Sequence, residues 1–300
     1  MTLLYTPLQF LAIFFLYSAL GWGSEVAFAA LSEHQLVNRG FLNGPVCPLY
    51  GSGMVAILVL LGPWIHNPIV VFFGGMVITT AVEYIAGKLL YWLFGAQWWD
   101  YSMYKYNFQG LVCLRFSFFW GIGCLVLVLG IHPVLAGLIL RIPQPVLFGS
   151  CLFFLLLFTV DLIVSVASAF GLNKRLAQLE DARKALRRGS DLLTNFVGTN
   201  VLTADEMFDE QKLQLALAKL QGKENAAEMQ RQFLAFQRDA MAKYQAAAQK
   251  LEHQRFFGAG HLLRAFPDMT NTAYRDTLAY LKAQAKELAQ KAKAPKKGKK

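Results

Sequence analysis

Three acidic side chains stand inside otherwise apolar stretches of the sequence: Glu25, Glu83 and Asp161. An ionised side chain deep in a bilayer costs about 2.5–3.5 kcal/mol on insertion scales, so all three should face the interior of a helix bundle. Arg39 and Arg115 are the expected partners, because guanidinium pairs bidentately with carboxylate. Such pairs either only hold helices and loops together, or they line a polar cavity that binds a head group, an ion or a solute.

Two predicted loops carry further polar candidates. Residues 38–45, with the sequence Asn-Arg-Gly-Phe-Leu-Asn-Gly-Pro, include Arg39 and Asn43, and residues 98–107 begin with Trp-Trp-Asp-Tyr-Ser. We expect both loops on the cytoplasmic side, near the inner ends of the helices that carry Glu25 and Glu83. We interpret Trp98 and Trp99 as anchors at the membrane interface. The predicted polar cluster, or transport path, consists of Glu25, Arg39, Asn43, Glu83, Asp100, Asn107, Arg115 and Asp161.

The overall composition indicates which elements position these residues. Hydrophobic residues make up 55% of the 300-residue chain and charged residues only 16%, compared with about 25% charged in soluble domains. A single soluble domain is therefore excluded. Five apolar segments approach the roughly 20 residues that cross a bilayer: residues 8–31, 48–65, 69–94, 113–142 and 146–172. The second is short and Gly-rich, which lets helix backbones approach closely, and His132-Pro133 interrupts the fourth.

The distribution of charge predicts the orientation of these segments. Residues 1–171 hold five basic and five acidic side chains, so the net charge of +10 falls on residues 172–300. The fifth segment is followed at once by a basic cluster, which places that end in the cytoplasm: Lys174, Arg175, Arg183, Lys184, Arg187 and Arg188. Five spans then put the N-terminus outside. We predict a multi-pass protein of the cell membrane, without a cleaved signal peptide because the start has no basic region.

The basic C-terminal part is predicted to be helical. Leu172, Leu176, Leu179 and Leu186 continue the fifth span as a helix, which Gly189-Ser190 should break. Thr203-Ala-Asp-Glu206 fits a capping box. A coiled-coil-like seam follows, ended by Gly258-Ala-Gly260 and Pro267, before a last helix over residues 272–292. The seam residues are Met229, Phe233, Phe236, Ala240, Tyr244, Ala247 and Leu251.

These patterns define the predicted organisation. The chain is all-α, with a transmembrane domain over residues 1–172, a cytoplasmic helical domain over residues 173–294 and a disordered basic tail over residues 295–300. The cytoplasmic seam closes either an intrachain helical hairpin or a homo-oligomeric coiled coil. The terminal lysines can contact anionic lipid. Nucleic-acid binding is not expected, because the aromatic residues are not interleaved with those lysines.

Several catalytic motifs are missing from the sequence. It contains no Gly-x-x-x-x-Gly-Lys-Ser/Thr loop, so this chain does not hydrolyse ATP in the P-loop manner. It contains no Gly-x-Ser-x-Gly and no His-Glu-x-x-His. The cysteines do not form Cys-x-x-Cys and are expected to be buried, reduced thiols: Cys47, Cys113, Cys124 and Cys151. We expect no metal site and no cofactor, and no catalytic residue is assigned.

A family resemblance is carried by residues in these same loops and spans. Gly21-Trp22 with Glu25, residues 38–45, and Cys47-Pro-Leu-Tyr-Gly51 resemble the bacterial family described as putative ABC-transporter type IV permeases (CmpB-like). The resemblance continues through Glu83, Trp98-Trp-Asp-Tyr-Ser102, Asn107, Gly110, Cys113-Leu114, Ser117, Trp120-Gly121, His132-Pro133 and Asp161. It extends to Leu262-Leu-Arg-Ala-Phe-Pro267. The chain departs from the family at Gln109-Gly-Leu111, where a basic residue is expected after the glycine.

The resemblance implies an integral membrane transport component, a permease subunit of an ABC-type system served by a separate ATPase. Two other hypotheses stay open. One is a membrane enzyme that acts on lipid head groups at the cytoplasmic face, with the same carboxylates as acid/base groups. The other is a non-catalytic membrane scaffold that recruits partners through its tail. The expected partners are membrane lipids, a separate ATPase subunit and further copies of the chain, because five spans are few for solute passage through one protomer.

Overall fold

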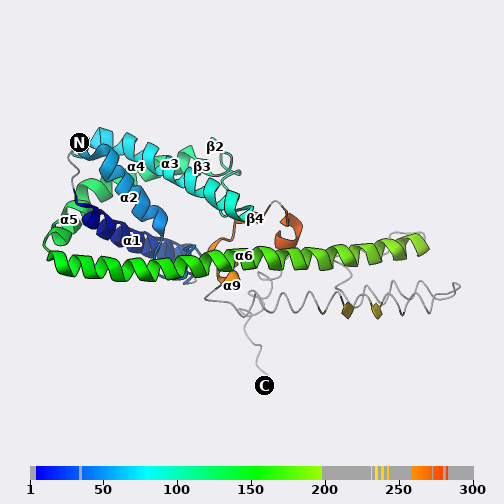
Figure 1. The fold of residues 1–300 in the computed structure, drawn as a ribbon. Coiled ribbons are helices and arrows are strands. Elements are labelled where there is room, and N and C mark those ends of the chain that lie inside the picture. The colour runs from blue at the N-terminus through cyan, green and yellow to red at the C-terminus, as the bar shows by residue number, and fades with distance from the viewer. Residues whose placement is uncertain are drawn as a thin grey trace, which may run out of the picture. The chain divides into compact units, whose positions relative to one another are not determined.

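The computed structural model describes residues 5–33, 36–197, 258–271 and 273–279, together with positions 231, 234, 235, 238, 239, 242 and 282. These residues are mostly helical (Figure 1). The chain divides into two compact units. The first comprises Met1–Phe170 and Phe256–Thr272, and the second comprises Gly171–Arg255 and Ala273–Lys300. Each unit therefore combines segments that are far apart in the sequence.

Within the described ranges, four helical stretches are long and apolar enough to cross a membrane. They are helix α1 (Pro7–Glu33), helix α3 (Pro68–Phe94), the continuous stretch Leu114–Leu140, and the portion Gln144–Asp181 of helix α6 (Gln144–Val197). The remaining predicted span is a shorter apolar helix, α2 (Pro48–Leu61), followed by a single 3-10 turn, η1 (Gly62–Trp64). The chain is thus a multi-pass membrane protein.

Prolines and caps set the ends of α2 and α3. Both helices begin with proline, whose fixed φ and missing N–H suit the first turn of a helix. The side chain of Asn67 caps α3 by accepting hydrogen bonds from the backbone N–H groups of Ile69 (3.0 Å) and Val70 (3.3 Å). Gly95 ends α3 in the left-handed conformation, with φ of 62°, which glycine adopts without strain.

The stretch Leu114–Leu140 changes its winding where the sequence predicts an interruption. Helix α4 (Leu114–Leu125) passes into a π-helical segment, η2 (Val126–Ile131), and then into helix α5 (His132–Leu140). Pro133 lies in the first turn of α5 and has no backbone N–H to donate to the preceding turn. The π-helical segment accommodates the missing bond, so the span continues without a gap.

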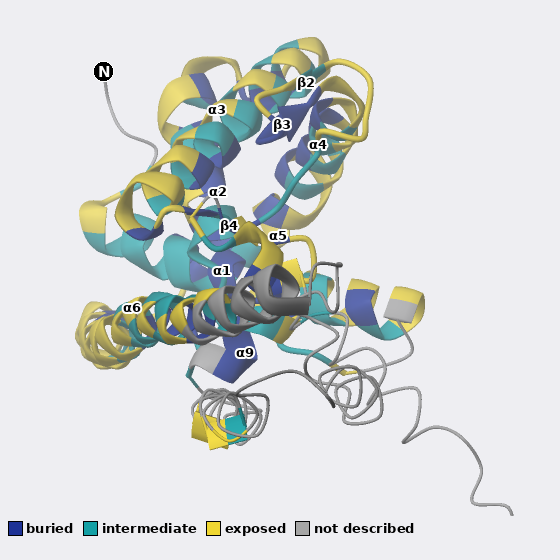
Figure 2. Cartoon of the chain, turned by 90° about the vertical axis from the view of Figure 1, so that its right-hand side faces the viewer, coloured by how far each residue is buried: buried dark blue, intermediate teal, exposed yellow. Residues whose placement is uncertain are grey.

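Glycines allow neighbouring helices of the first unit to pack closely. A Cβ atom at Gly51 of α2 would overlap with the carbonyl oxygen of Phe14 and the hydroxyl of Ser18, both on α1. A Cβ at Gly75 of α3 would lie 2.7 Å from the Cβ of Cys124 on α4. The close approach predicted from the Gly-rich second segment is therefore confirmed. Buried side chains of these helices form one core, which includes Ile13, Tyr17, Met54, Leu58, Val71 and Cys124. Figure 2 colours the buried parts of the chain dark blue.

Short strands organise the loops of the first unit. Strand β2 (Asn107–Phe108) pairs antiparallel with β3 (Val112–Cys113) in a hairpin between α3 and α4. Strand β1 (Ala96–Gln97), directly after α3, pairs antiparallel with β4 (Thr270–Asn271). Helix α9 (Ala259–Ala265) precedes β4 in the sequence and starts after Gly258, where φ is 82°. The segment 258–271 is thus part of the same unit as the membrane helices.

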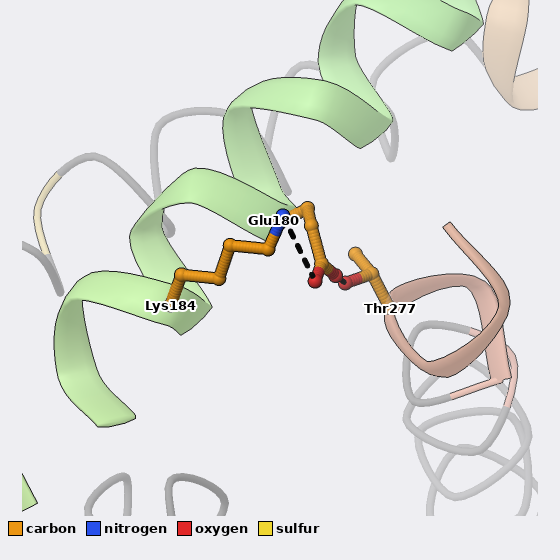
Figure 3. Close-up of polar contacts among 3 residues, drawn as sticks. All are labelled: Glu180, Lys184 and Thr277. Carbon is orange, nitrogen blue, oxygen red and sulfur yellow. Dashed lines mark hydrogen bonds and ion pairs between the residues drawn. The ribbon is translucent and has the colours of Figure 1, made fainter. Parts of the chain in front are cut away.

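In the second unit, α6 continues as predicted from its leucine spacing, and Leu172, Leu176 and Leu179 are buried. The predicted break at Gly189-Ser190 is wrong, because α6 runs through both residues to Val197. A glycine in a helix costs only about 1 kcal/mol relative to alanine, which favourable neighbours can offset. Figure 3 shows Glu180 of α6 accepting a hydrogen bond from Thr277 and forming an ion pair with Lys184 at 3.9 Å.

Several predictions fall outside the described residues. They are the capping box at Thr203-Ala-Asp-Glu206, the coiled-coil-like seam and the lysine-rich end of the chain. Of the predicted last helix, residues 273–279 and 282 are described, and residues 275–279 are helical. The hairpin and coiled-coil alternatives for the tail therefore stay predictions.

Candidate functional site

A cavity of about 290 Å³ lies among helices α1, α2, α3 and α4 and the π-helical segment η2 of the first unit. Most of its lining side chains are apolar, including Leu20, Met54, Ile57, Val82 and Leu127. The few polar or aromatic side chains that line it are Tyr17, Ser24, Tyr50, Thr79, Glu83 and Trp120. A concave apolar site with a small number of polar groups is the usual form of a small-molecule binding site.

Glu83 contributes a carboxylate to the lining of this cavity. It is residue 16 of the 27 in α3 and is only 5% exposed. Its Oε1 accepts a hydrogen bond from the hydroxyl of Tyr101 at 3.1 Å. Its Oε2 is buried and has no hydrogen-bond partner within the described part of the chain. The protein therefore holds Oε1 by a hydrogen bond, and we call Oε2, which accepts none from the described residues, the open oxygen.

The loop after α3 holds the donor to Glu83 in place. The N–H of Tyr101 donates to the carbonyl of Gly110 at 2.8 Å, and its ring stacks on Phe116 with centroids 4.8 Å apart. Burial, followed by the nearby charge of Glu83, raises the pKa of Tyr101. Its hydroxyl thus stays protonated at physiological pH and remains a hydrogen-bond donor.

Asp100 and Asn107 shape this loop and do not line the cavity. Asp100 accepts a hydrogen bond from the N–H of Ser102 at 2.8 Å, and Asn107 Oδ1 accepts one from the N–H of Gly110 at 3.1 Å. Asn107 also donates to the carbonyl of Tyr104 at 2.7 Å. These are local side chain-to-backbone bonds of the kind that stabilise turns. Their role in the structure is to position the segment that carries Tyr101.

Glu25 lies next to the cavity and is held by one of its lining residues. The hydroxyl of Tyr50 donates to Glu25 Oε1 at 2.5 Å, and the Tyr50 ring meets Trp120 edge-on with centroids 5.5 Å apart. Glu25 and Glu83 are close enough to interact electrostatically. The structure thus brings these two predicted site residues together around the same cavity wall.

Asn43 and Asp161 form a second cluster, at the loop that joins α1 to α2. Asp161 Oδ1 accepts hydrogen bonds from the backbone N–H (3.1 Å) and side-chain amide (3.0 Å) of Asn43, and Oδ2 accepts one from the N–H of Gly44 (2.8 Å). The hydroxyl of Ser165 donates to the same Oδ1 at 3.3 Å. Helix α6 therefore fastens this loop through one carboxylate.

Among the described residues, the hydrogen bonds to the three carboxylates come from neutral donors rather than from the two expected arginines. Glu25 and Glu83 accept hydrogen bonds from tyrosines, and Asp161 accepts them from amide and hydroxyl groups. The Arg115 guanidinium lies 5.8 Å from the ring centroid of Tyr104. Arg39 is half-buried in the loop between α1 and α2 and does not line the cavity. Hydroxyls and amides satisfy a carboxylate without the desolvation cost of a second buried charge.

The interpretation of Trp98 as an interfacial anchor is wrong. Trp98 is 2% exposed, and its ring contacts Phe41 (5.2 Å), Phe94 (5.8 Å) and Phe266 (4.9 Å, between centroids). Trp99 is partly buried, and its indole N–H donates to the carbonyl of Leu111 at 2.8 Å. The loop that follows α3 turns inward, because β1 pairs with β4 and draws Trp98 into the core.

The segment 258–271 contributes residues that the sequence analysis missed. His261 is 3% exposed, and its Nε2 lies 3.1 Å from the carbonyl oxygen of Gly40. The N–H of Gly258 donates to Asn43 Oδ1 at 3.3 Å. The available signal was the Leu-Leu-Arg-Ala-Phe-Pro string at residues 262–267, which marked this stretch as family-like without indicating that it packs on the loop at residues 38–45.

His132, which directly follows the π-helical segment η2, contacts a tyrosine that lines the cavity. His132 is 5% exposed, and its ring nitrogens lie 3.0 Å from the Tyr5 hydroxyl and 3.2 Å from the Tyr17 hydroxyl. Tyr17 also lines the cavity. The sequence indicates His132 only as part of a helix interruption, because its two tyrosine partners are distant in sequence.

Comparison with known proteins identifies a family. A family model described as "Putative ABC-transporter type IV" matches residues 12–166, about half of the chain. All eight predicted site residues fall inside this range, as do all residues that line the cavity. The segment 258–271 lies beyond it. Neither the curated proteins nor the solved structures gave a match.

Proposed function

Because this chain belongs to the putative ABC-transporter type IV family, we propose that it is the membrane-embedded permease subunit of a transport system whose ATPase is a separate chain. The observation that carries the proposal is Glu83, a buried carboxylate with one open oxygen in a cavity between membrane helices. Ionisable residues within membrane helices are rare and commonly mark ion or substrate pathways. The cavity beside Glu83 is then a substrate site on the transport path.

The proposed topology has five spans. Helix α2 with η1, Pro48–Trp64, is the second span along the chain and adds a short member to the four long ones. Its length is acceptable because Gly51 packs it tightly against α1 within the bundle. Basic residues after the last span then place the C-terminal part in the cytoplasm and the N-terminus outside. The loop between α3 and α4 is cytoplasmic in this arrangement.

That loop is the proposed contact for the ATPase. Met103 is 94% exposed and Tyr106 is 82% exposed, although both side chains are apolar or aromatic. The same loop carries Tyr101, the donor to Glu83. A partner that moves this loop would therefore act directly on the cavity carboxylate, which is the coupling that an ATP-driven permease requires.

Site-specific photocrosslinking tests the proposal without knowledge of the substrate. A photoreactive amino acid replaces Met103 in one variant and His66 in another, and the tagged proteins are crosslinked in native membranes and examined by mass spectrometry. Both positions are exposed, and they lie beyond opposite ends of α3. We expect an ATPase chain crosslinked in stoichiometric yield from position 103 and not from position 66.

The opposite results would redirect the interpretation. Crosslinking of the ATPase from position 66 would reverse the proposed orientation. A homo-oligomer with tightly bound lipid and no ATPase from either position would reject the permease subunit, and would favour the lipid-enzyme or scaffold hypotheses.

A further inference from the structure

In its ionised form Glu83 needs a donor at Oε2, and none of the described residues makes a regular hydrogen bond to this atom. Buried polar atoms are nearly always hydrogen-bonded, and leaving a charged one unpaired is costly. The hydroxyls that line the cavity are committed elsewhere: Ser24 donates to the carbonyl of Gly21 (2.7 Å) and Thr79 to that of Gly75 (2.8 Å). The Trp120 indole N–H is directed at the carboxylate as a weak donor, and Oε2 still has no regular hydrogen bond among the described residues.

The hydroxyls of the two cavity tyrosines are engaged as well. Tyr50 donates to Glu25, and Tyr17 lies within hydrogen-bond distance of His132. A bound molecule can therefore supply a full hydrogen bond to Glu83 Oε2. Because the acceptor is a carboxylate, the best complement is a positively charged N–H group.

The walls around Glu83 indicate the rest of that molecule. The rings of Tyr50 and Trp120, which meet edge-on, are of the type whose faces attract cations. Beyond them the lining is aliphatic, with Leu20, Ile57 and Val82 among its residues. A molecule with one cationic end and an apolar body would match both regions.

The cavity volume limits the size of the molecule. At about 290 Å³, it lies at the small end of the roughly 300–1,000 Å³ typical of ligand sites. We propose that the cavity binds a small protonated amine with an apolar body, whose ammonium N–H donates to Glu83 Oε2 while its body packs against the aliphatic wall. The proposal rests on the proposed function, since it names the substrate class of that transport path.

Binding of tritiated phenethylamine to the purified full-length protein in phosphatidylcholine/phosphatidylglycerol nanodiscs tests the proposal. At neutral pH this probe is protonated and carries one apolar ring. We expect saturable binding that unlabelled phenethylamine displaces and that 2-phenylethanol, its neutral analogue, does not. The variant Glu83→Gln keeps the shape of the side chain and removes its charge, so it should weaken binding about tenfold or more.

Two matched controls separate a loss of the site from a loss of the fold. Asp181→Asn makes the same change of charge at an exposed position of α6 and should bind like the wild type. Gly123→Leu adds a side chain at a cavity-lining glycine where a Cβ meets no atom within 4 Å, so it should block binding. Gly137→Leu makes the same change at a glycine with equally free surroundings outside the cavity and should not.

Each result either supports or overturns the proposal. Equal binding by the wild type and Glu83→Gln, or equal displacement by 2-phenylethanol, overturns it. Nanodiscs that contain phosphatidylethanolamine identify the source of the amine: competition with the probe assigns the site to an aminolipid head group, and no competition assigns it to a free amine. The crosslinking experiment does not involve the amine, so a failure of the substrate class is distinguishable from a failure of the permease role.

Discussion

The hydrogen bonds between Asp161 and the loop at residues 38–45 should control how often that loop opens. In Asp161→Asn, the side-chain oxygen can stay with the donors of Asn43 and Ser165, but its NH2 group then faces the N–H of Gly44. One charge-assisted bond is lost and one backbone donor is left without an acceptor. Each effect is of order 1–3 kcal/mol. We take about 2 kcal/mol, which corresponds to a roughly 30-fold increase in opening.

Alkylation of Cys47 measures this opening. Cys47 lies three residues after Gly44, and its backbone N–H donates to the carbonyl of Ser18 at 2.9 Å. Burial, with a smaller contribution from Glu25, raises the pKa of its thiol to about 12. The thiol is therefore almost entirely protonated at neutral pH and reacts slowly while the loop is closed. The rate of modification, followed by peptide mass spectrometry at neutral pH, should increase roughly 30-fold in Asp161→Asn, in proportion to local opening.

Two controls make the measurement specific. Cys151 is buried against the carbonyl of Leu8 and should react at an unchanged rate in the same sample. Asn43→Ala should increase the alkylation rate of Cys47 much less in the Asp161→Asn background than in the wild type, because both residues belong to one hydrogen-bond network. If the Cys47 rate in Asp161→Asn equals that of the wild type, or if Cys151 speeds up equally, the carboxylate is not what fastens the loop.

Two further predictions concern packing and pH. Gly51→Ala should lower the thermal unfolding midpoint in detergent by the equivalent of about 1–3 kcal/mol, because the added Cβ overlaps with helix α1. The control Gly149→Ala, at an open position, should leave the midpoint unchanged or raise it. Equal midpoints for the two variants would contradict the packing argument. Burial lowers the pKa of His261 below its ordinary 6.5. The stabilisation that neutral His261 gives to the docking of residues 258–271 is therefore complete above pH 6.5 and is lost as the pH falls below 6.5. Hydrogen exchange of this segment, corrected for the intrinsic pH dependence, should increase on acidification in the wild type and much less in His261→Gln.

The sequence was informative where a single segment determines the outcome. Apolar runs of sufficient length predicted the long membrane helices, and the position of Asp161 in one of them predicted that its carboxylate would be bonded inside the bundle. The identity of the partners was not predictable in the same way. Charge alone suggested Arg39 and Arg115, whereas the donors are tyrosine hydroxyls and the backbone N–H groups of a loop, which carry no signature in the side-chain sequence.

Contacts that join segments far apart in the sequence could not be predicted from the sequence either. Strands β1 and β4 contain two residues each, too few for any alternation of polar and apolar side chains to indicate a strand. Without that pairing, Trp98 beside a predicted span looks like an interfacial residue, and only the tertiary contact with Phe266 places it in the core. The cavity depends likewise on four helices at once, and the sequence showed Glu83 but not the open oxygen.

The β1–β4 pair also sets an order of events during synthesis. Ala96 and Gln97 leave the ribosome about 170 residues before their partners Thr270 and Asn271, a delay on the order of ten seconds at typical translation rates. During that interval the membrane helices are already made, while Trp98 still lacks the Phe266 ring. A nascent chain that ends before residue 258 would therefore insert its membrane helices, but Trp98 would lack its contact with Phe266. The quality-control proteases of the cell would then determine the lifetime of this chain.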